Sequence, residues 1–123
     1  MKYKISVISG DGIGPEIMKC SIDVMKSLEE KLNIEFELLE IEAGDSALKN
    51  NGIALSDEAI DKIKTTNACI KAPVGESAME VIVKLRQLFD LYVNLRPAKT
   101  FPTVKGLDDD IDMLIVRENT EDL

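Results

Sequence analysis

The sequence predicts an α/β fold with a largely parallel sheet flanked by helices, and two observations support this prediction. Short runs rich in β-branched residues alternate with amphipathic helical patterns along the whole chain, an order that is typical of parallel sheets. Of the 123 residues, 45% are hydrophobic, which is the usual share for a globular chain with a packed core.

The first part of the chain predicts a strand, a turn, a helix and a second strand. Residues 3–9 alternate and are rich in β-branched side chains, and this strand stops at the glycines of residues 10–14. Pro15 then begins a helix. Its core-facing side is expected to carry the residues that recur at three- and four-residue spacing: Ile17, Ser21, Val24, Leu28 and Leu32. Residues 34–43 alternate apolar and acidic side chains, which predicts a strand with one solvated face.

The rest of the chain continues the alternation of helices and strands. Ser56 is expected to cap the next helix, because acidic residues that favour the helix dipole follow it directly. Residues 67–72 form a short apolar strand ended by Pro73. The last predicted elements are a helix and two strands, at residues 81–89, 91–95 and 111–116. Pro97 ends the first of these strands, and Arg117 follows the second.

Composition excludes several classes of function. The chain has no histidine, so it cannot hold a Ser-His or Cys-His nucleophile pair or a histidine-ligated metal. A formal net charge of −8 without a basic tract argues against a nucleic-acid partner. No signal peptide and no apolar run of membrane-spanning length is present, so we expect a cytoplasmic protein without a membrane partner. Cys20 and Cys69 lack metal or redox spacing and are expected to be buried.

The glycine-rich turn at residues 10–14 invites comparison with phosphate-binding loops. A junction between a strand and a helix offers free N–H groups and a positive dipole end, which suit phosphate. The spacing does not match the dinucleotide fingerprint, because Pro15 occupies the third glycine position and Asp11 would put a carboxylate beside the pyrophosphate. A plain tight turn is therefore the favoured interpretation.

Three arginines are candidates for binding a ligand. Arg86 lies in a predicted helix, and Arg96 and Arg117 lie at predicted strand ends. Open α/β sheets bind ligands at the carboxyl ends of strands, and arginine binds carboxylates in a bidentate way, so converging arginines would suit a dicarboxylate. The alternative is surface ion pairs with nearby acidic residues, and spacing alone leaves both interpretations open. Three such residues follow the last arginine: Glu118, Glu121 and Asp122.

Four segments together resemble the N-terminal part of the β-decarboxylating dehydrogenases, the family of isocitrate, 3-isopropylmalate and homoisocitrate dehydrogenases. They are GDGIGPE at residues 10–16, IKAPVG at 70–75, KLRQLFDLYVNLRPAK at 84–99 and IVRENTEDL at 115–123. They occur in the family's order and cover the chain from end to end. The first segment alone is a weak signal, whereas the four together are specific.

The resemblance implies that a 2-hydroxy dicarboxylic acid is oxidised by NAD or NADP and then loses its β-carboxylate, with Mg²⁺ or Mn²⁺ polarising the hydroxyl. By matching positions, Arg86, Arg96 and Arg117 correspond to the family's substrate-carboxylate arginines. Ile13 corresponds to the turn residue that packs against the cofactor. The loop that lies along the nicotinamide corresponds to Lys71, Ala72, Pro73, Val74, Gly75 and Glu76.

The resemblance places the choice of substrate in the helix before Arg86. Isocitrate enzymes carry Ser and Asn at the positions that Glu80 and Ile82 occupy here. Glu80 would repel a third carboxylate, whereas Ile82 and Val83 would bury an isopropyl group, a difference of about 1–3 kcal/mol. This favours 3-isopropylmalate, and hence leucine biosynthesis, over isocitrate and homoisocitrate. The segment RENTEDL at residues 117–123 does not decide among them, because all three kinds of member share it.

The resemblance also implies what this chain lacks. The family's catalytic Tyr and Lys, its metal-binding Asp residues and its adenosine-binding loop are expected beyond Leu123, so the chain alone would be inactive. Residues 1–98 are expected to be the N-terminal part of the large domain, and residues 99–123 the start of the smaller one. The large domain's sheet would be incomplete without the C-terminal part. A dimer or tetramer is expected for the complete enzyme, and a stand-alone binding or regulatory module is the non-enzymatic alternative.

Overall fold

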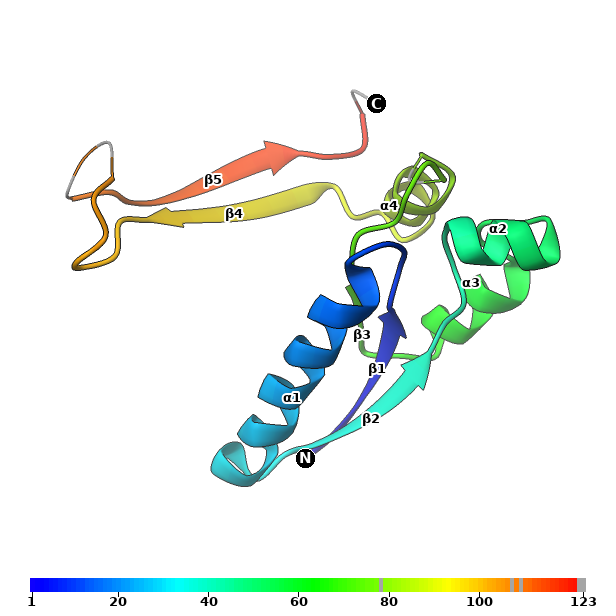
Figure 1. Ribbon diagram of the computed structural model, residues 1–123, viewed down its shortest axis with the longest axis horizontal. Coiled ribbons are helices and arrows are strands. Elements are labelled where there is room, and N and C mark those ends of the chain that lie inside the picture. Colours follow the sequence, from blue (N-terminus) through cyan, green and yellow to red (C-terminus); the bar gives the residue numbers. More distant parts are fainter. Residues whose placement is uncertain (78, 107, 109, 122–123) are drawn as a thin grey trace. The chain divides into compact units, whose positions relative to one another are not determined.

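The computed structural model describes residues 1–77, 79–106, 108 and 110–121 (Figure 1). The chain divides into two compact units, Met1–Val81 and Ile82–Leu123, called unit 1 and unit 2 below.

Unit 1 contains a three-stranded parallel sheet. Its strands are β1 (Lys2–Ile8), β2 (Glu35–Glu40) and β3 (Ala68–Lys71), in the order β2-β1-β3. The central strand is the most buried, and Ser6, Val7 and Ile8 are fully shielded from solvent. This sheet confirms the predicted α/β fold. Because the strands are parallel, the carboxyl ends of β1 and β3 lie at the same edge of the sheet.

Helix α1 (Gly14–Leu32) packs on one face of this sheet (Figure 1). Its packing side carries Met18 and Ile22, which lie against Val7 and Ala72. The predicted core-facing side is wrong, because four of its five residues are between 38% and 61% exposed: Ile17, Val24, Leu28 and Leu32. Gly14, the first residue of the helix, is buried and so sets which side of the helix turns inward. Residues 18 and 22 follow on that side at four-residue spacing.

Two short helices, α2 (Asp45–Asn51) and α3 (Asp57–Lys64), follow β2. Helix α3 buries three apolar residues, Ala59, Ile60 and Ile63. The predicted cap is confirmed, because the Ser56 hydroxyl oxygen accepts a hydrogen bond from the Ala59 amide at 3.1 Å. The sequence does not predict α2, whose seven residues, DSALKNN, carry too few apolar positions for a helical pattern.

Replacing Ser56 by alanine is expected to lower the free energy of unfolding by about 1 kcal/mol, because it leaves the Ala59 amide without its acceptor. Ser56→Asp is the matched control, since aspartate keeps an acceptor at the cap and favours the helix dipole. Urea unfolding of both variants measures the difference. Equal stability of Ser56→Ala and Ser56→Asp would contradict this role of the cap.

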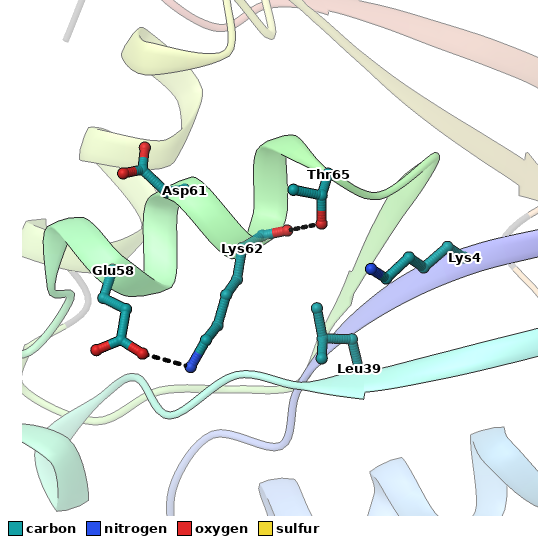
Figure 2. A pocket seen from close by; sticks show the side chains of 6 residues that line it. All are labelled: Lys4, Leu39, Glu58, Asp61, Lys62 and Thr65. Carbon is teal, nitrogen blue, oxygen red and sulfur yellow. Dashed lines mark hydrogen bonds and ion pairs between the residues drawn. The ribbon is translucent and has the colours of Figure 1, made fainter.

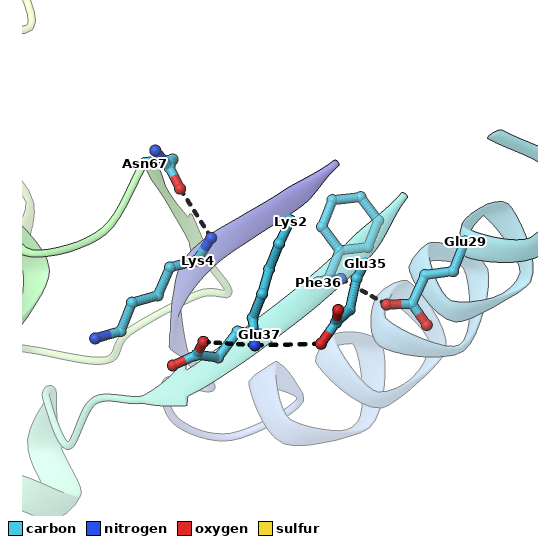
Figure 3. A network of polar contacts seen from close by, with 7 residues as sticks. All are labelled: Lys2, Lys4, Glu29, Glu35, Phe36, Glu37 and Asn67. Atoms are coloured by element: carbon cyan, nitrogen blue, oxygen red, sulfur yellow. Dashed lines mark hydrogen bonds and ion pairs between the residues drawn. The ribbon is translucent and has the colours of Figure 1, made fainter. Parts of the chain in front are cut away.

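Polar contacts join the amino-terminal ends of the strands to neighbouring segments (Figure 3). The Asn67 side-chain oxygen accepts a hydrogen bond from the Lys4 amide at 2.8 Å, just before β3 begins. The Glu29 carboxylate of α1 accepts one from the Phe36 amide of β2 at 2.6 Å. Lys2 forms exposed ion pairs with two glutamates of β2, which add little to stability. The two hydrogen bonds therefore define where β2 and β3 enter the sheet.

Unit 2 contains a hairpin and most of a helical segment. A π-helix, η1 (Met79–Val83), crosses the boundary between the units and continues as α4 (Lys84–Leu88). Strands β4 (Val93–Lys99) and β5 (Asp112–Glu118) then pair in an antiparallel sheet. The last two strands therefore do not extend the parallel arrangement of unit 1.

Pro97 does not end its strand, contrary to the prediction. It lies within β4, opposite Leu114 of β5. The Thr100 amide donates to the Ile111 carbonyl at 2.9 Å, and amides that face the partner strand alternate along an antiparallel pair. The backbone amides of even-numbered residues in β4 therefore point toward β5, whereas the nitrogen of Pro97 points toward the open edge of the two-stranded sheet. Proline is tolerated in that position because no ladder hydrogen bond is lost.

Both cysteines are exposed, which contradicts the expectation that they are buried. Cys20 lies on α1 away from the Met18 side, and Cys69 lies on β3, an edge strand of the sheet. None of the helices in the described part of the chain is long and apolar enough to cross a membrane.

Candidate functional site

The glycine turn after β1 is a close contact between two backbone segments. The Asp11 amide donates to the Pro73 carbonyl at 2.9 Å, and the Gly14 amide donates to the Asp11 carbonyl at 2.8 Å. Gly10 has a φ of 68°, and a Cβ atom on it would overlap the Pro73 carbonyl. The glycines therefore let the turn approach the loop after β3. Two of the turn's amides, those of Asp11 and Gly14, are bonded within the chain, which agrees with a tight turn.

The predicted cofactor-binding residues of unit 1 lie at one edge of the sheet. Ile13 belongs to the turn after β1 and is 61% exposed. The loop of residues 72–76 follows β3, the strand beside β1. The Lys71 ammonium donates to the Ala72 carbonyl at 2.8 Å. The structure thus brings the two cofactor-binding segments predicted from the resemblance together at the carboxyl ends of neighbouring strands, where open α/β sheets bind ligands.

Two aspartates that sequence reasoning missed tie these segments to α2. The Asp11 carboxylate accepts hydrogen bonds from the amides of Asp45 (2.8 Å), Ser46 (3.0 Å) and Gly75 (3.2 Å), and from the Ser46 hydroxyl (2.9 Å). The Asp45 carboxylate accepts from the amides of Glu76 (3.0 Å) and Ser77 (2.8 Å). The only sequence signal is a Gly-Asp pair in each segment, which predicts a turn but no partner.

The Asp11 carboxylate is held in its charged form. Partial burial is the largest single influence and raises the pKa of Asp11, but the hydrogen bonds from Asp45, Ser46 and Gly75 together outweigh it and lower that pKa below its usual value. Hydrogen bonds to an ionised acceptor are roughly twice as strong as those between neutral groups. The contact between the turn, α2 and the loop is therefore a strong one.

In unit 2, the hairpin places two of the predicted arginines side by side. Arg96 of β4 is opposite Ile115 of β5, and Arg117 is opposite Asn94. Positions 115 and 117 lie on the same face of a strand, so Arg96 and Arg117 are diagonal neighbours on one face, with about 7–8 Å between their backbone positions. Both are exposed. Arg96 lies in mid-strand rather than at the predicted strand end, because β4 runs on through Pro97.

The ion-pair interpretation of these arginines finds no support among the described residues, where neither arginine has a carboxylate within ion-pair distance. The Arg96 Nε atom donates instead to the Asn94 side-chain oxygen at 3.4 Å. Glu118, next to Arg117, accepts hydrogen bonds from the amides of Thr120 (2.6 Å) and Glu121 (3.0 Å), which lower the pKa of Glu118 to about 2. Asp122 lies outside the described residues.

The predicted substrate-selecting residues lie in the helical segment before the hairpin. Glu80 is exposed, and Ile82 and Val83 are partly buried, all within η1. Arg86 of α4 is also partly buried, and its carbonyl accepts a hydrogen bond from the Leu91 amide at 2.9 Å. Ile82 and Val83 lie four and three residues before Arg86, which puts them on the same side of a helix.

A surface hollow between α3 and the sheet does not coincide with any predicted site residue (Figure 2). Several of its polar groups already have partners. The Lys62 ammonium forms an ion pair with Glu58 at 2.7 Å, and the Thr65 hydroxyl donates to the Lys62 carbonyl at 2.7 Å. It offers no converging set of unpaired polar groups for a ligand.

Comparison with known proteins identifies the family of this chain. The family model for isocitrate/isopropylmalate dehydrogenase matches residues 4–123. The chain belongs to the isocitrate/isopropylmalate dehydrogenase family. This confirms the resemblance on which the roles of the arginines and of the loop depend.

Relatives within the isocitrate/isopropylmalate dehydrogenase family are similar in sequence to the whole length of this chain. The 3-isopropylmalate dehydrogenases of Saccharolobus solfataricus and Sulfurisphaera tokodaii are 49% and 46% identical over 100% of this chain, which covers 37% and 36% of their lengths. A crystal structure of isocitrate dehydrogenase from Methylococcus capsulatus matches 97% of this chain and 35% of that chain, with a TM-score of 0.78 and 35% identity. The chain thus spans little more than a third of the length of these relatives.

The described residues do not fit the metal ion that the dehydrogenase family implies. Among residues 1–77, 79–106, 108 and 110–121, no three Cys, Asp or Glu side chains are close enough to hold one. Asp11 and Asp45, two carboxylates of the predicted cofactor side, already accept six hydrogen bonds from the chain. For the dinucleotide, the Ile13 side chain is exposed beside the loop after β3, while the amides of Asp11 and Gly14 are already bonded within the chain.

Proposed function

We propose that this chain is the N-terminal part of an NAD- or NADP-dependent dehydrogenase that oxidises and decarboxylates 3-isopropylmalate. The observation that carries the proposal is the pair Arg96 and Arg117 on one face of the hairpin. Neither has a carboxylate partner among the described residues, so both are available for a ligand's carboxylates. Full-length relatives at 46–49% identity that carry the name 3-isopropylmalate dehydrogenase support this substrate.

In this proposal the arginines bind and orient the substrate. The guanidinium groups of Arg96 and Arg117 hold carboxylates by bidentate hydrogen bonds, each worth about 1.5–3 kcal/mol, and Arg86 contributes a third. A bound dinucleotide would serve as the hydride acceptor, and Mg²⁺ or Mn²⁺, held by residues outside this chain, would polarise the hydroxyl. Ile13 and residues 71–76 hold the nicotinamide side of the cofactor. Fixing the carboxylates leaves the reacting carbon in one orientation.

The remaining expectations are part of the same proposal. Residues 1–98 belong to the large domain and residues 99–123 begin the smaller one. The exposed apolar side of α1 and the open edge at β3 support a large domain whose sheet and helix are covered by further chain. The complete enzyme is a cytoplasmic dimer or tetramer that acts on a small molecule, with no nucleic-acid or membrane partner.

The complete protein is expected to turn over 3-isopropylmalate with a higher kcat/KM than isocitrate. In Ile82→Asn, which introduces the residue of isocitrate enzymes, kcat/KM for 3-isopropylmalate is expected to fall roughly 10- to 100-fold, because the isopropyl group loses its apolar contact. Leu88→Asn is the matched control: Leu88 is 52% exposed at the end of α4, and its change leaves kcat/KM within about twofold.

Preferred turnover of isocitrate by the wild-type protein would overturn the substrate assignment and favour the isocitrate alternative. Saturable binding of a dicarboxylate without turnover, in calorimetry on the complete protein with cofactor and Mg²⁺ present, would favour the non-enzymatic module. Steady-state kinetics with the two substrates, followed by absorbance of the reduced cofactor, distinguishes these outcomes.

A further inference from the structure

Two carboxylates of unit 1 join three segments that lie far apart in the sequence. Asp11 in the glycine turn bonds to the start of α2 and to the Gly75 amide, and Asp45 at the start of α2 bonds to the next two amides, those of Glu76 and Ser77. We call this set of six hydrogen bonds the aspartate network. Three consecutive amides of the loop after β3 are therefore held by two carboxylates.

Two glycines approach the carboxylates of Asp11 and Asp45 closely. A Cβ atom on Gly44 would overlap the Asp11 carboxylate, and a Cβ atom on Gly75 would overlap the Asp45 carboxylate. Glycine at these two positions lets the carboxylates reach the amides directly. The two carboxylates therefore hold the loop through direct hydrogen bonds to its backbone.

The loop is also held at its other end by the same turn. The Asp11 amide donates to the Pro73 carbonyl at 2.9 Å, while the Asp11 carboxylate accepts from the Gly75 amide at 3.2 Å. One residue thus fixes the loop on both sides of Val74. A loop held at successive backbone groups has a defined position, whereas a loop that follows a short edge strand without such bonds would have several.

We propose that Asp11 and Asp45 are positioning residues that fix residues 71–76 in the conformation that binds the dinucleotide's nicotinamide side. This inference rests on the proposed function, which assigns that loop to the cofactor. Neither aspartate touches the cofactor; both act through the loop's backbone. Weakening the aspartate network will therefore weaken cofactor binding and leave binding of the hydroxy acid to the arginines unchanged.

The test uses the complete protein and measures KM for NAD and for NADP, KM for 3-isopropylmalate and kcat. Asp11→Asn replaces one acceptor oxygen by an NH₂ group that faces N–H donors, so KM for the cofactor is expected to rise by about tenfold, the loss of one charge-assisted hydrogen bond. KM for the hydroxy acid is expected to stay within twofold. Hydrogen exchange at the Gly75, Glu76 and Ser77 amides is expected to accelerate.

Two further variants keep the test decisive. Ser46→Ala removes only the hydroxyl that donates to Asp11 and is expected to raise KM for the cofactor about twofold, which carries the test if Asp11→Asn does not fold. Asp61→Asn is the matched control: it removes the same charge from an exposed ion pair with Lys64 and is expected to leave every constant unchanged.

The outcomes separate this inference from the proposed function. If the wild-type protein neither binds NAD or NADP nor oxidises a 2-hydroxy dicarboxylate, the proposed function fails, and this inference fails with it. If the wild-type protein is active but Asp11→Asn and Ser46→Ala keep KM for the cofactor at the wild-type value, only this inference is overturned. A parallel rise in KM for both ligands together with a loss of thermal stability would show a merely structural role and would also overturn it.

Discussion

In the complete enzyme, Arg96→Lys is expected to reduce kcat/KM for 3-isopropylmalate by roughly 10- to 100-fold, because lysine cannot form the bidentate bond and loses about 1.5–3 kcal/mol of charge-assisted hydrogen bonding. The positive charge stays, so the result isolates the geometry of the guanidinium group. Arg96 and Arg117 share a face of the hairpin. The double variant Arg96→Lys/Arg117→Lys is therefore expected to lose less than the sum of the two single losses if both bind the same carboxylate.

Lys99→Gln provides the matched control on the same strand. Lys99 lies on the opposite face of β4 from Arg96 and pairs with Asp112 across the hairpin. Removing this exposed charge is expected to change kcat/KM by less than about twofold. Initial rates at subsaturating substrate measure all four variants. An Arg96→Lys enzyme whose kcat/KM stays within twofold of wild type would show that the arginine does not bind the substrate.

Replacing Gly10 by alanine is expected to destabilise unit 1 strongly, for two additive reasons. Gly10 has a φ of 68°, in the left-handed region, which costs an alanine about 1–2 kcal/mol. Its Cβ would also overlap the Pro73 carbonyl, so the turn and the loop must move apart, at a further cost of about 1–3 kcal/mol. Separation of the two segments would break the hydrogen bond from the Asp11 amide to Pro73.

Gly12→Ala is the matched control for this prediction. Gly12 has a φ of 58°, but a Cβ atom on it meets nothing within 4 Å. It should therefore show the cost of the left-handed backbone alone, about 1–2 kcal/mol. Urea unfolding of the complete protein compares the two variants, and the difference between them measures the close approach to Pro73. Equal destabilisation by Gly10→Ala and Gly12→Ala would mean that the turn and the loop after β3 move apart at no cost.

Short-range patterns predicted most local elements of unit 1 correctly, although not α2. Alternation predicted β1, and the serine before an acidic pair predicted the start of α3, where the Ser56 cap is confirmed. These features depend on residues within one turn of helix or a few strand positions, so the sequence contains all of the information they need. The four family segments likewise predicted the family, because they compare residue identities rather than contacts.

Structural features for which the sequence allows two arrangements were not predicted correctly. Helix α1 has apolar residues on two sides, and the periodicity of Ile17, Val24 and Leu28 selected the side that is exposed. The buried Gly14 and the methionine that follows it four residues later determine the packing side instead. Pro97 could end a strand or lie on an open edge, and only the pairing of β4 with β5 decides between these.

The sequence by itself determined the α/β class, the membership of a dehydrogenase family and the three arginines as carboxylate-binding candidates. Only the tertiary structure decided that Arg96 and Arg117 share one face and that Asp11 holds the loop after β3. The physical reason is distance along the chain: the partners of Asp11 lie 34, 35 and 64 residues away. A single aspartate between two glycines predicts a turn, and its acceptor oxygens acquire a function only when the sheet brings α2 and the loop to them.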